Sequence, residues 1–458
     1  MKYSFLFLIF LMPAAFSLAQ EKPGPGDRLT VKRIVDETMI NSTAYENLRF
    51  LCKKIGPRLS GSDNAMKAVY ATEKMLKDAG ADTVYLQPCR VNHWVRGAKE
   101  TGSFSAEGKK YILHLTALGN SEGSKGKTIE AEIVEVKTMA ELDALGNSVK
   151  GKIVFFNIPM NPVYFNTFRA YGESGIGRRS GPTQAAKYGA IGALVRSLAS
   201  NPDDHPHTGA TQYNDSFPKI PAVAISTNDA NRISGLLASG KKVTGSFKTN
   251  CSLLGTVPSF NVIGEIKGTE FPEQIIDVGG HLDSWDLAEG AEDDGTGIVQ
   301  SIEVIRVLKA TGLRPKRNIR AVMFMNEENG TGGALAYLAN AKLKKEQHIF
   351  ALESDNGGFT PRGFNLDMSD EQIKRVESWA PLFYEYGVYD FNGRGSDSDV
   401  GYLKEIGTAL AGLSPDSQRY FDIHHAETDV FENVSKREVD LGAANMAALI
   451  WLVSEHGL

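Results

Sequence analysis

The sequence predicts an α/β fold, a three-layer sandwich around a mostly parallel central sheet, interrupted by an inserted β-rich domain. From residue 261 onward, short apolar runs typical of buried strands alternate with patterns of helical spacing. That order is expected when helices pack on both faces of a parallel sheet. Between residues 116 and 249, closely spaced β-type runs bounded by glycines take over. We therefore expect one domain built from residues 20–115 and 250–458, and a second domain at 116–249.

The chain begins with the pattern of a targeting segment. Lys2 precedes an apolar run at residues 5–12, and small residues occupy Ser17 and Ala19. A basic start, a short apolar stretch and a small-x-small site are typical of a signal peptide, here cleaved after Ala19. The apolar run is too short for a membrane span, which needs about 20 residues. We expect residues 1–19 to be removed, leaving a secreted or periplasmic protein without a membrane anchor.

Periodicity predicts the remaining elements in order. After the signal peptide, helices are expected at 27–39, 42–54 and 62–79 and a strand at 83–88. The insert should hold strands at 130–136, 152–157, 193–195 and 222–225 and helices at 183–188 and 228–238. Thereafter helices are expected at 297–311, 332–341, 370–386 and 438–455, and strands at 318–325, 348–352 and 408–413. These assignments follow from apolar spacing of 3.6 residues for helices and 2 for half-buried strands.

Composition is that of an ordinary folded protein, with 42% hydrophobic and 23% charged residues in 458. The formal net charge of −5 argues against a nucleic-acid partner. Three cysteines, Cys52, Cys89 and Cys251, allow one disulfide in an oxidising compartment, but the sequence does not choose the pair. Three free buried thiols are an equally good interpretation.

A metal-site pattern starts where a predicted strand at 275–278 ends. His281 and Asp283 follow this strand and stand two residues apart. Since residues two apart on a strand face the same side, we expect the Asp283 carboxylate to lie beside the His281 imidazole. A metal-bound histidine usually has such a partner on its other ring nitrogen, which orients the ring. Asp293 comes twelve residues after His281, on a glycine-flanked turn before a helical pattern.

Further acids and imidazoles follow later runs. Glu327 and Glu328 close the run at 321–325, Asp355 follows the strand at 350–352, and a later loop carries two histidines. The candidate ligands are His281, Asp293, Glu328, Asp355 and His425. Two imidazoles and three carboxylates, one of them shared, could hold two divalent ions about 3.5–4 Å apart. Nitrogen and oxygen donors without thiolates suit zinc.

Taken singly, each motif has an ordinary structural explanation. A lone Glu-Glu pair is usually a solvated charge pair, and a single His-x-Asp is structural in most proteins. The metal-site hypothesis therefore depends on the joint order and spacing of all the motifs. The other histidines lack such context and are interpreted as surface or structural residues: His93, His114, His205, His207, His348 and His456.

In these motifs the chain resembles the M28 family of co-catalytic zinc exopeptidases, most closely its carboxypeptidase Q subfamily. The matching segments are 281–283, 290–297, 327–328, 353–355 and 424–425, together with Gly-Pro-Arg-Leu-Ser-Gly-Ser at 56–62. The resemblance implies two zinc ions per chain bridged by Asp293. It assigns His281 and Asp355 to one ion, and Glu328 and His425 to the other. It also implies a zinc aminopeptidase-like fold and a protease-associated domain as the insert.

The resemblance further assigns roles in catalysis. Glu327 would be the general base, in addition to the orienting role that the spacing gives Asp283. Asp294 follows Asp293 through a peptide bond that the family often holds in cis. Many members carry a tyrosine that stabilises the oxyanion immediately before the last histidine, and His424 stands at that position here. The family also leads us to expect a homodimer.

The sequence therefore predicts a secreted dizinc exopeptidase acting on dipeptides or short peptides. Aminopeptidase, dipeptidase and carboxypeptidase activities all stay open. A carboxypeptidase needs a cation for the terminal carboxylate, and Arg394 in a glycine-rich loop is one candidate. Two other classes remain as alternatives, a single-zinc cyclase or acyltransferase and a non-catalytic binding protein on the same fold. Metal stoichiometry separates the peptidase from the cyclase.

Overall fold

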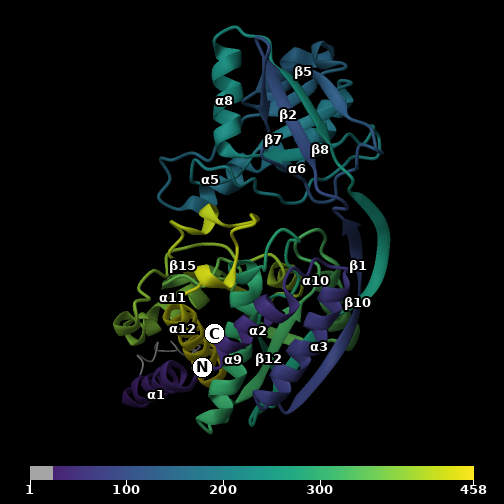
Figure 1. Cartoon of the computed structure of the whole chain (residues 1–458). Coiled ribbons are helices and arrows are strands. Elements are labelled where there is room, and N and C mark those ends of the chain that lie inside the picture. The colour runs from purple at the N-terminus through teal and green to yellow at the C-terminus, as the bar shows by residue number, and fades with distance from the viewer. Residues whose placement is uncertain (1–23) are drawn as a thin grey trace, which may run out of the picture.

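The computed structural model describes residues 24–458, so the predicted signal peptide at 1–19 lies outside the described residues. Figure 1 shows two lobes, one above the other. The main lobe comprises residues 25–95 and 252–456, and the inserted lobe comprises residues 101–248. Two long neighbouring strands connect the lobes, β1 (Thr83–Val95) and β10 (Ser252–Ile266). Within residues 24–458, no helix is both long enough and apolar enough to cross a membrane.

The main lobe contains a seven-stranded sheet in the order β1-β10-β12-β11-β13-β15-β14. The remaining strands are β11 (Phe271–His281), β12 (Arg317–Phe324), β13 (Gln347–Glu353), β14 (Pro361–Asp367) and β15 (Ala409–Pro415). The middle strands β12, β11, β13 and β15 run parallel, whereas β1, β10 and β14 pair antiparallel. The sheet is therefore mixed. Its four middle strands are parallel, as predicted, but the strand pairs that flank them are antiparallel, contrary to the prediction. The chain leaves for the insert along β1 and returns along β10, which makes this pair antiparallel.

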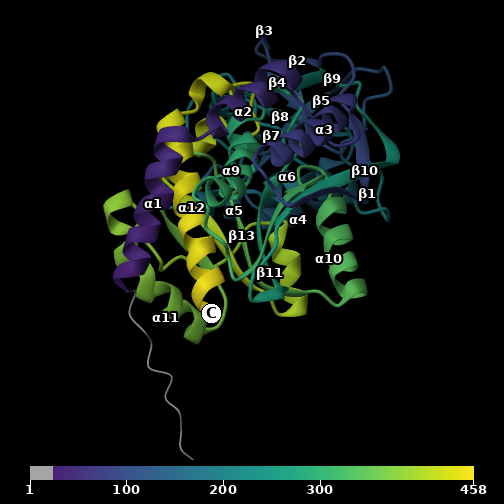
Figure 2. The same ribbon diagram turned by 90° about the horizontal axis from the view of Figure 1, so that it is seen from below.

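Helices cover both faces of the main sheet, giving three layers. The helices are α1 (Pro25–Asn41), α2 (Ala44–Phe50), α3 (Asp63–Asp78), α9 (Thr296–Ala310), α10 (Gly332–Lys344), α11 (Asp370–Trp379) and α12 (Lys436–His456). Side chains of β12 alternate between the layers, so that Met323 joins the core with α9 and α12 and Phe324 joins the core with α10. Figure 2 shows α1 beside α12 on one side, with α10 on the opposite side.

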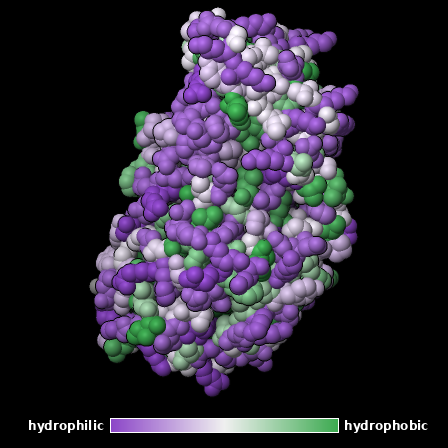
Figure 3. All heavy atoms as spheres, viewed as in Figure 1, coloured by the Kyte–Doolittle hydropathy of each residue, from purple (hydrophilic) through white to green (hydrophobic). Residues whose placement is uncertain are grey.

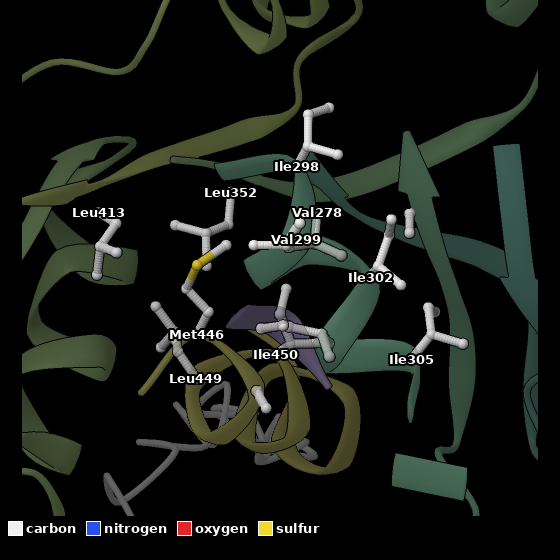
Figure 4. Packing of buried hydrophobic residues seen from close by; sticks show 14 of the residues in the cluster. Val278, Ile298, Val299, Ile302, Ile305, Leu352, Leu413, Met446, Leu449 and Ile450 are labelled. Carbon is white, nitrogen blue, oxygen red and sulfur yellow. The ribbon is translucent and has the colours of Figure 1, made fainter. Parts of the chain in front are cut away.

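The larger core lies between the sheet and the pair α9 and α12. Figure 4 shows Ile298 and Ile302 of α9 near Val278 of β11, with Met446 of α12 near Leu352 of β13. All of these side chains are buried. Burying one such side chain is worth roughly 1.5–3 kcal/mol relative to leaving it in water. This core fixes the strand ends that carry the candidate ligands.

The inserted lobe contains an eight-stranded sheet in the order β3-β2-β9-β5-β6-β7-β8-β4. Its strands are β2 (Thr101–Ala106), β3 (Lys109–Ile112), β4 (Leu115–Ala117), β5 (Ile129–Val136), β6 (Ile153–Phe156), β7 (Gly192–Arg196), β8 (Ala222–Ile225) and β9 (Thr244–Lys248). Its helices are α4 (Met139–Leu145), α5 (Thr167–Ser174), α6 (Ile176–Arg179), α7 (Gly181–Lys187) and α8 (Thr227–Ala238). Residues 101–112, expected in the first part of the other domain, pair in this sheet because β2 is hydrogen-bonded to β9.

The structure distinguishes between a disulfide and free thiols for the three cysteines. Cys52, Cys89 and Cys251 are all buried and free. Burial raises the pKa of the Cys52 thiol to about 12, so this thiol remains protonated and unreactive near neutral pH. Cys52 and Cys89 therefore act as small core residues of the main lobe, where both belong to its principal hydrophobic cluster.

Candidate metal centre

The candidate ligands gather at the carboxyl ends of three parallel strands, beneath the inserted lobe. His281 is the last residue of β11, and the segment with Glu327 and Glu328 follows β12. Asp355 lies two residues beyond the end of β13. Neighbouring parallel strands end at the same edge of a sheet, so these side chains converge although they are far apart in sequence.

One group of side chains surrounds the His281 ring. Its Nε2 atom lies 3.1 Å from Oδ1 of Asp293 and 3.2 Å from Oδ1 of Asp355. Three donor atoms from these residues lie close enough together to share one metal ion. All three side chains belong to the main lobe.

A second group lies on the other side of Asp293. Nε2 of His425 lies 3.2 Å from Oδ2 of Asp293 and 3.2 Å from Oε2 of Glu328. Nε2 of His424 also lies 3.6 Å from the same Asp293 oxygen, and the two histidine rings stack with centroids 3.6 Å apart. Asp293 thus presents one carboxylate oxygen to each group, the arrangement expected of a bridging ligand.

The donors fit divalent ions on grounds beyond proximity. Oδ2 of Asp293 is buried and has no hydrogen-bond partner among residues 24–458. A buried oxygen without a partner is costly unless something binds it. Burial also raises the pKa of Glu328 to about 8 and that of Asp355 to about 6. Divalent cations would stabilise the ionised carboxylates that burial disfavours, as metal binding does when it displaces protons.

Charge balance among the histidines supports the same conclusion. Burial opposes protonation of His281 and His425, but the carboxylates of Asp355 and Glu328 outweigh burial and raise the pKa of both imidazoles well above its usual value. Burial likewise opposes ionisation of Asp293, yet the adjacent His281 and His425 imidazoles hold its pKa well below the usual range. Without metal, the protons on His281 and His425 therefore supply the positive charge that balances the carboxylates. Bound ions would supply that charge instead.

The turn that carries Asp293 is held by the N-terminal Gly-Pro-Arg-Leu segment. The buried Arg58 guanidinium donates to the carbonyl oxygens of Leu282, Glu289 and Gly290 at 2.7, 2.6 and 2.9 Å. Gly290 has φ +59°, and a Cβ there would lie 2.2 Å from Ser284. The Asp293–Asp294 peptide bond is cis, as the resemblance implied. Residues distant in sequence thereby fix the turn that carries the Asp293 carboxylate.

The predicted pairing of the Asp283 carboxylate with His281 is wrong at the atomic level. Nδ1 of His281 lies 2.9 Å from the backbone oxygen of Asp283, and that oxygen is the acceptor. The carboxylate instead accepts the N–H groups of Asn326 and Glu327 at 2.7 and 3.0 Å. Strand alternation holds only within a strand, and β11 ends at His281. Asp283 thus orients the histidine through its carbonyl and fixes the Glu327 segment through its side chain.

Glu327 lines a cavity of about 840 Å³ between the lobes. Ser398, which sequence analysis missed, donates a hydrogen bond of 2.6 Å to Oε1 of Glu327. The partly buried Asp397 also lines this cavity and accepts 2.7 Å from Asn356. Residues 396–399 read Ser-Asp-Ser-Asp after a glycine-rich loop, and that run of acids was the available signal.

The inserted lobe supplies part of the cavity wall, although its sequence shows no catalytic pattern. Tyr171, Arg178 and Arg179 line the cavity from the insert. Arg178 is buried; it donates 2.5 Å to the Tyr171 hydroxyl, and its Nε has no partner. Arg394 lines the same cavity, but it is half-exposed and donates to the carbonyls of Phe391 and Gly393. Figure 3 shows mostly hydrophilic residues with small hydrophobic patches on the face seen in Figure 1.

Comparison with known proteins identifies the class to which this fold and site belong. The profile of peptidase family M28 matches residues 261–450. Carboxypeptidase Q from Homo sapiens is 34% identical over 412 residues, covering 90% of this chain and 85% of that protein. The protein from Bos taurus is 32% identical over 470 residues, covering 99% and 97%. The chain belongs to the M28 family and is a metallo-exopeptidase, a hydrolase.

Solved structures agree with this assignment. A peptidase M28 precursor from Shewanella amazonensis SB2B has a TM-score of 0.88 and 30% identity, covering 93% of this chain and 96% of that one. A zinc aminopeptidase from Bacillus subtilis has a TM-score of 0.63 at 19% identity, covering 89% and 93%, and shows the shared fold. Within the family, this chain is similar to carboxypeptidase Q over almost its whole length.

Proposed function

We propose that this metallo-exopeptidase uses two zinc ions, bridged by Asp293, to hydrolyse dipeptides and short peptides. The observation that carries the proposal is the position of the Asp293 carboxylate between Nε2 of His281 and Nε2 of His425. The unpartnered Oδ2 atom and the mixture of imidazole and carboxylate donors fit zinc. The fold neighbour from Bacillus subtilis is named a zinc enzyme, which agrees with this choice.

Bound zinc ions would polarise the scissile carbonyl and lower the pKa of a shared water. Glu327 would remove the proton of that water and pass it to the leaving amine. Its carboxylate faces the cavity, while Ser398 and the Asp283 carboxylate hold its side chain and backbone. A general base held in this way reaches the reacting atoms without itself binding an ion.

His424 would stabilise the oxyanion that forms during attack. The His424 ring lines the cavity beside the second group, and Tyr171 contacts its edge at a centroid distance of 5.0 Å. Burial lowers the pKa of His424 well below its usual value, so its ring is neutral with a single N–H. A neutral imidazole N–H aimed at the developing charge supplies what an oxyanion donor requires.

Arg178 would bind the substrate's terminal carboxylate and so favour short substrates. Its Nη1 atom lies 3.3 Å from Nδ1 of His425, which places the guanidinium immediately beside the second metal group. One extended residue spans only about 3.3–3.6 Å, so a carboxylate bound at Arg178 lies about one residue from the scissile bond. The free α-amino group would then lie on the acid-rich side, near Asp355 and Asp397. Arg178 replaces Arg394 as the preferred candidate because it is buried and has an unpartnered Nε.

A dipeptide panel tests the proposal. Zinc-loaded enzyme should cleave a free dipeptide, fail on its N-acetylated form, and cleave its C-amide more weakly. Arg178→Gln should raise the KM for the free dipeptide about 10- to 100-fold, the loss expected for a charged hydrogen bond, and should remove the penalty for amidation. Arg394→Gln is the matched control and should change KM little. Efficient cleavage of the acetylated peptide would overturn this specificity.

Metal content separates the proposal from its alternatives. Elemental analysis should give near two zinc ions per chain, and a value near one would favour a cyclase or acyltransferase. A protein that binds zinc but cleaves no peptide would be a binding protein.

We also propose that the protein is exported after cleavage of a signal peptide following Ala19, that the insert is a protease-associated domain, and that the protein forms a homodimer. N-terminal sequencing of secreted protein and light scattering test the first and last of these.

A further inference from the structure

Among the contacts of the inserted lobe with the loop that carries His425, those of His207 and Thr208 are made to the backbone of the two loop histidines. Nδ1 of His207 lies 2.6 Å from the backbone oxygen of His424, and this oxygen can only accept. The Thr208 N–H donates 2.9 Å to the backbone oxygen of His425. Nδ1 of His425 lies 3.3 Å from the backbone oxygen of Thr208. The inserted lobe therefore holds the carbonyls of two consecutive histidines and faces the outer nitrogen of the second.

The segment is itself fixed within the inserted lobe. The His207 N–H donates 2.8 Å to the Ser197 hydroxyl, just beyond β7, and the Thr208 hydroxyl donates 2.8 Å to the carbonyl of Ala117 at the end of β4. His207 is buried, and in the described part of the chain its Nε2 atom has no hydrogen-bond partner. The His207 ring therefore has a single hydrogen bond, and that bond is made to the metal-site loop.

The His425 backbone needs such support. It has φ +62°, a left-handed conformation that residues other than glycine rarely adopt. Such a conformation persists only where the surroundings hold it. When Nε2 of His425 binds an ion, Nδ1 keeps its hydrogen and donates it to the Thr208 carbonyl. Outer partners of this kind set both the orientation and the basicity of a ligating histidine.

We propose that the inserted lobe clamps the His425 loop for the second ion, and that His207 is the positioning residue of this clamp. The inference rests on the proposed two-ion centre. It gives the insert a function in metal retention, in addition to walling the cavity. Loss of the His207 hydrogen bond should weaken the ion at His425 and spare the ion at His281, whose ring is supported within the main lobe.

His207→Leu and His207→Asn form a matched pair for the test. Leucine and asparagine have nearly the same shape, but only asparagine offers an N–H near the position of Nδ1. Zinc per chain is measured by elemental analysis at a series of buffered free zinc concentrations. We expect His207→Leu to weaken one ion about 10- to 100-fold, the range for outer partners of metal ligands, while His207→Asn retains both. Unchanged binding of both ions in His207→Leu would overturn the proposal.

A control separates the clamp from general docking of the lobes. Thr167 of the insert donates 2.7 Å through its hydroxyl to the carbonyl of Ser417 in the main lobe. Thr167→Val removes this contact and should retain both ions. Selective loss of the same ion in Thr167→Val would mean that lobe docking in general, and not His207, holds the loop.

Hydrogen exchange of residues 420–426 in metal-free protein gives a readout that needs no ion. This segment should exchange faster in His207→Leu than in the wild type or His207→Asn, and equal rates would contradict the clamp. Should His207→Leu fail to fold, His207→Gln, with its amide displaced toward Nε2, takes its place. A wild-type protein with one zinc ion would overturn the proposed function, while the exchange comparison would still decide the role of His207.

Discussion

His281 and His425 occupy equivalent positions on either side of Asp293, but the chain supports them in different ways. His281 ends a central strand, and its outer nitrogen faces a carbonyl two residues away in the same lobe. His425 lies in a loop with left-handed backbone, and its outer nitrogen faces a carbonyl 217 residues away in the other lobe. One half of the centre is therefore part of the sheet, and the other half depends on how two lobes meet.

The largest effect should come from removing what the two halves share. Among residues 24–458, Asp293 has the only carboxylate that faces both imidazoles. In Asp293→Ala both ions should therefore be lost or disordered together, and activity should be abolished. Elemental analysis of the purified variant measures this directly. Loss of one ion alone would mean that the halves are independent and that another residue bridges them.

Glu327→Gln should leave both halves loaded with metal and still remove turnover. The amide keeps the shape of the side chain but accepts no proton, so kcat should fall by about 10²–10⁴-fold, the contribution of general acid–base catalysis. Zinc content and melting temperature should match those of the wild type. Near-normal kcat in this variant would remove Glu327 from the mechanism.

His424→Ala should affect chemistry on the loop half alone. A single oxyanion donor is worth about 2.7–4 kcal/mol, so kcat should fall at least about 10²-fold with little change in KM. His424→Tyr should recover part of the activity, because a phenol can donate from the same loop position. If alanine leaves kcat intact, His424 only packs against His425.

The smallest effect should be a contrast in pH dependence between the two lobes. Burial opposes protonation of His348 in β13, but the Asp277 carboxylate outweighs burial and raises its pKa to about 9. Glu346 accepts from the same ring, while Arg320 and Tyr337 complete the network. In the inserted lobe, burial lowers the pKa of His207 to about 3.

The signs of these two contributions to stability are opposite. Protonated His348 stabilises the fold fully below pH 6.5, and that contribution is lost as the pH rises through about 9. Neutral His207 makes the fold less stable as the pH falls below 6.5, because the unfolded chain then binds the extra proton. The stability difference between wild type and His348→Gln, roughly 2–3 kcal/mol at pH 6, should shrink by pH 10. Denaturant melts at both pH values measure it, and a constant difference would contradict the shift.

The positions of the candidate ligands at the strand ends could be predicted from sequence, because their signals are local. Each of His281, Glu328 and Asp355 follows an apolar run, which indicates the end of a strand. The carboxyl ends of parallel strands lie at one edge of a sheet. The hydrogen-bond partners of the Asp283 carboxylate could not be predicted, because hydrophobic periodicity does not show at which residue β11 ends. The antiparallel pairing of the flanking strands could not be predicted either, because apolar runs look alike in parallel and antiparallel pairs.

The contributions of the inserted lobe could not be found in the same way. The residues adjacent to Arg178 show no catalytic pattern, and the acids and histidine adjacent to His207 are better interpreted as a polar loop. Their importance arises because α6 and the 207–208 segment meet a loop more than 200 residues later. Such contacts depend on how the two lobes dock, and no periodicity encodes docking.

The antiparallel pair β1 and β10 explains how a chain can accept so large an interruption. Their partners run from Thr83 opposite Glu265 to Val95 opposite Ser252, so the strand that leaves the main lobe and the strand that returns are neighbours. For the folding of the main lobe, the insert is equivalent to a long loop whose two ends are held side by side by β1 and β10. The entropy of closing a loop rises only by about 0.6 kcal/mol for each doubling of its length. The length of the insert therefore adds little to the entropic cost of folding the main lobe.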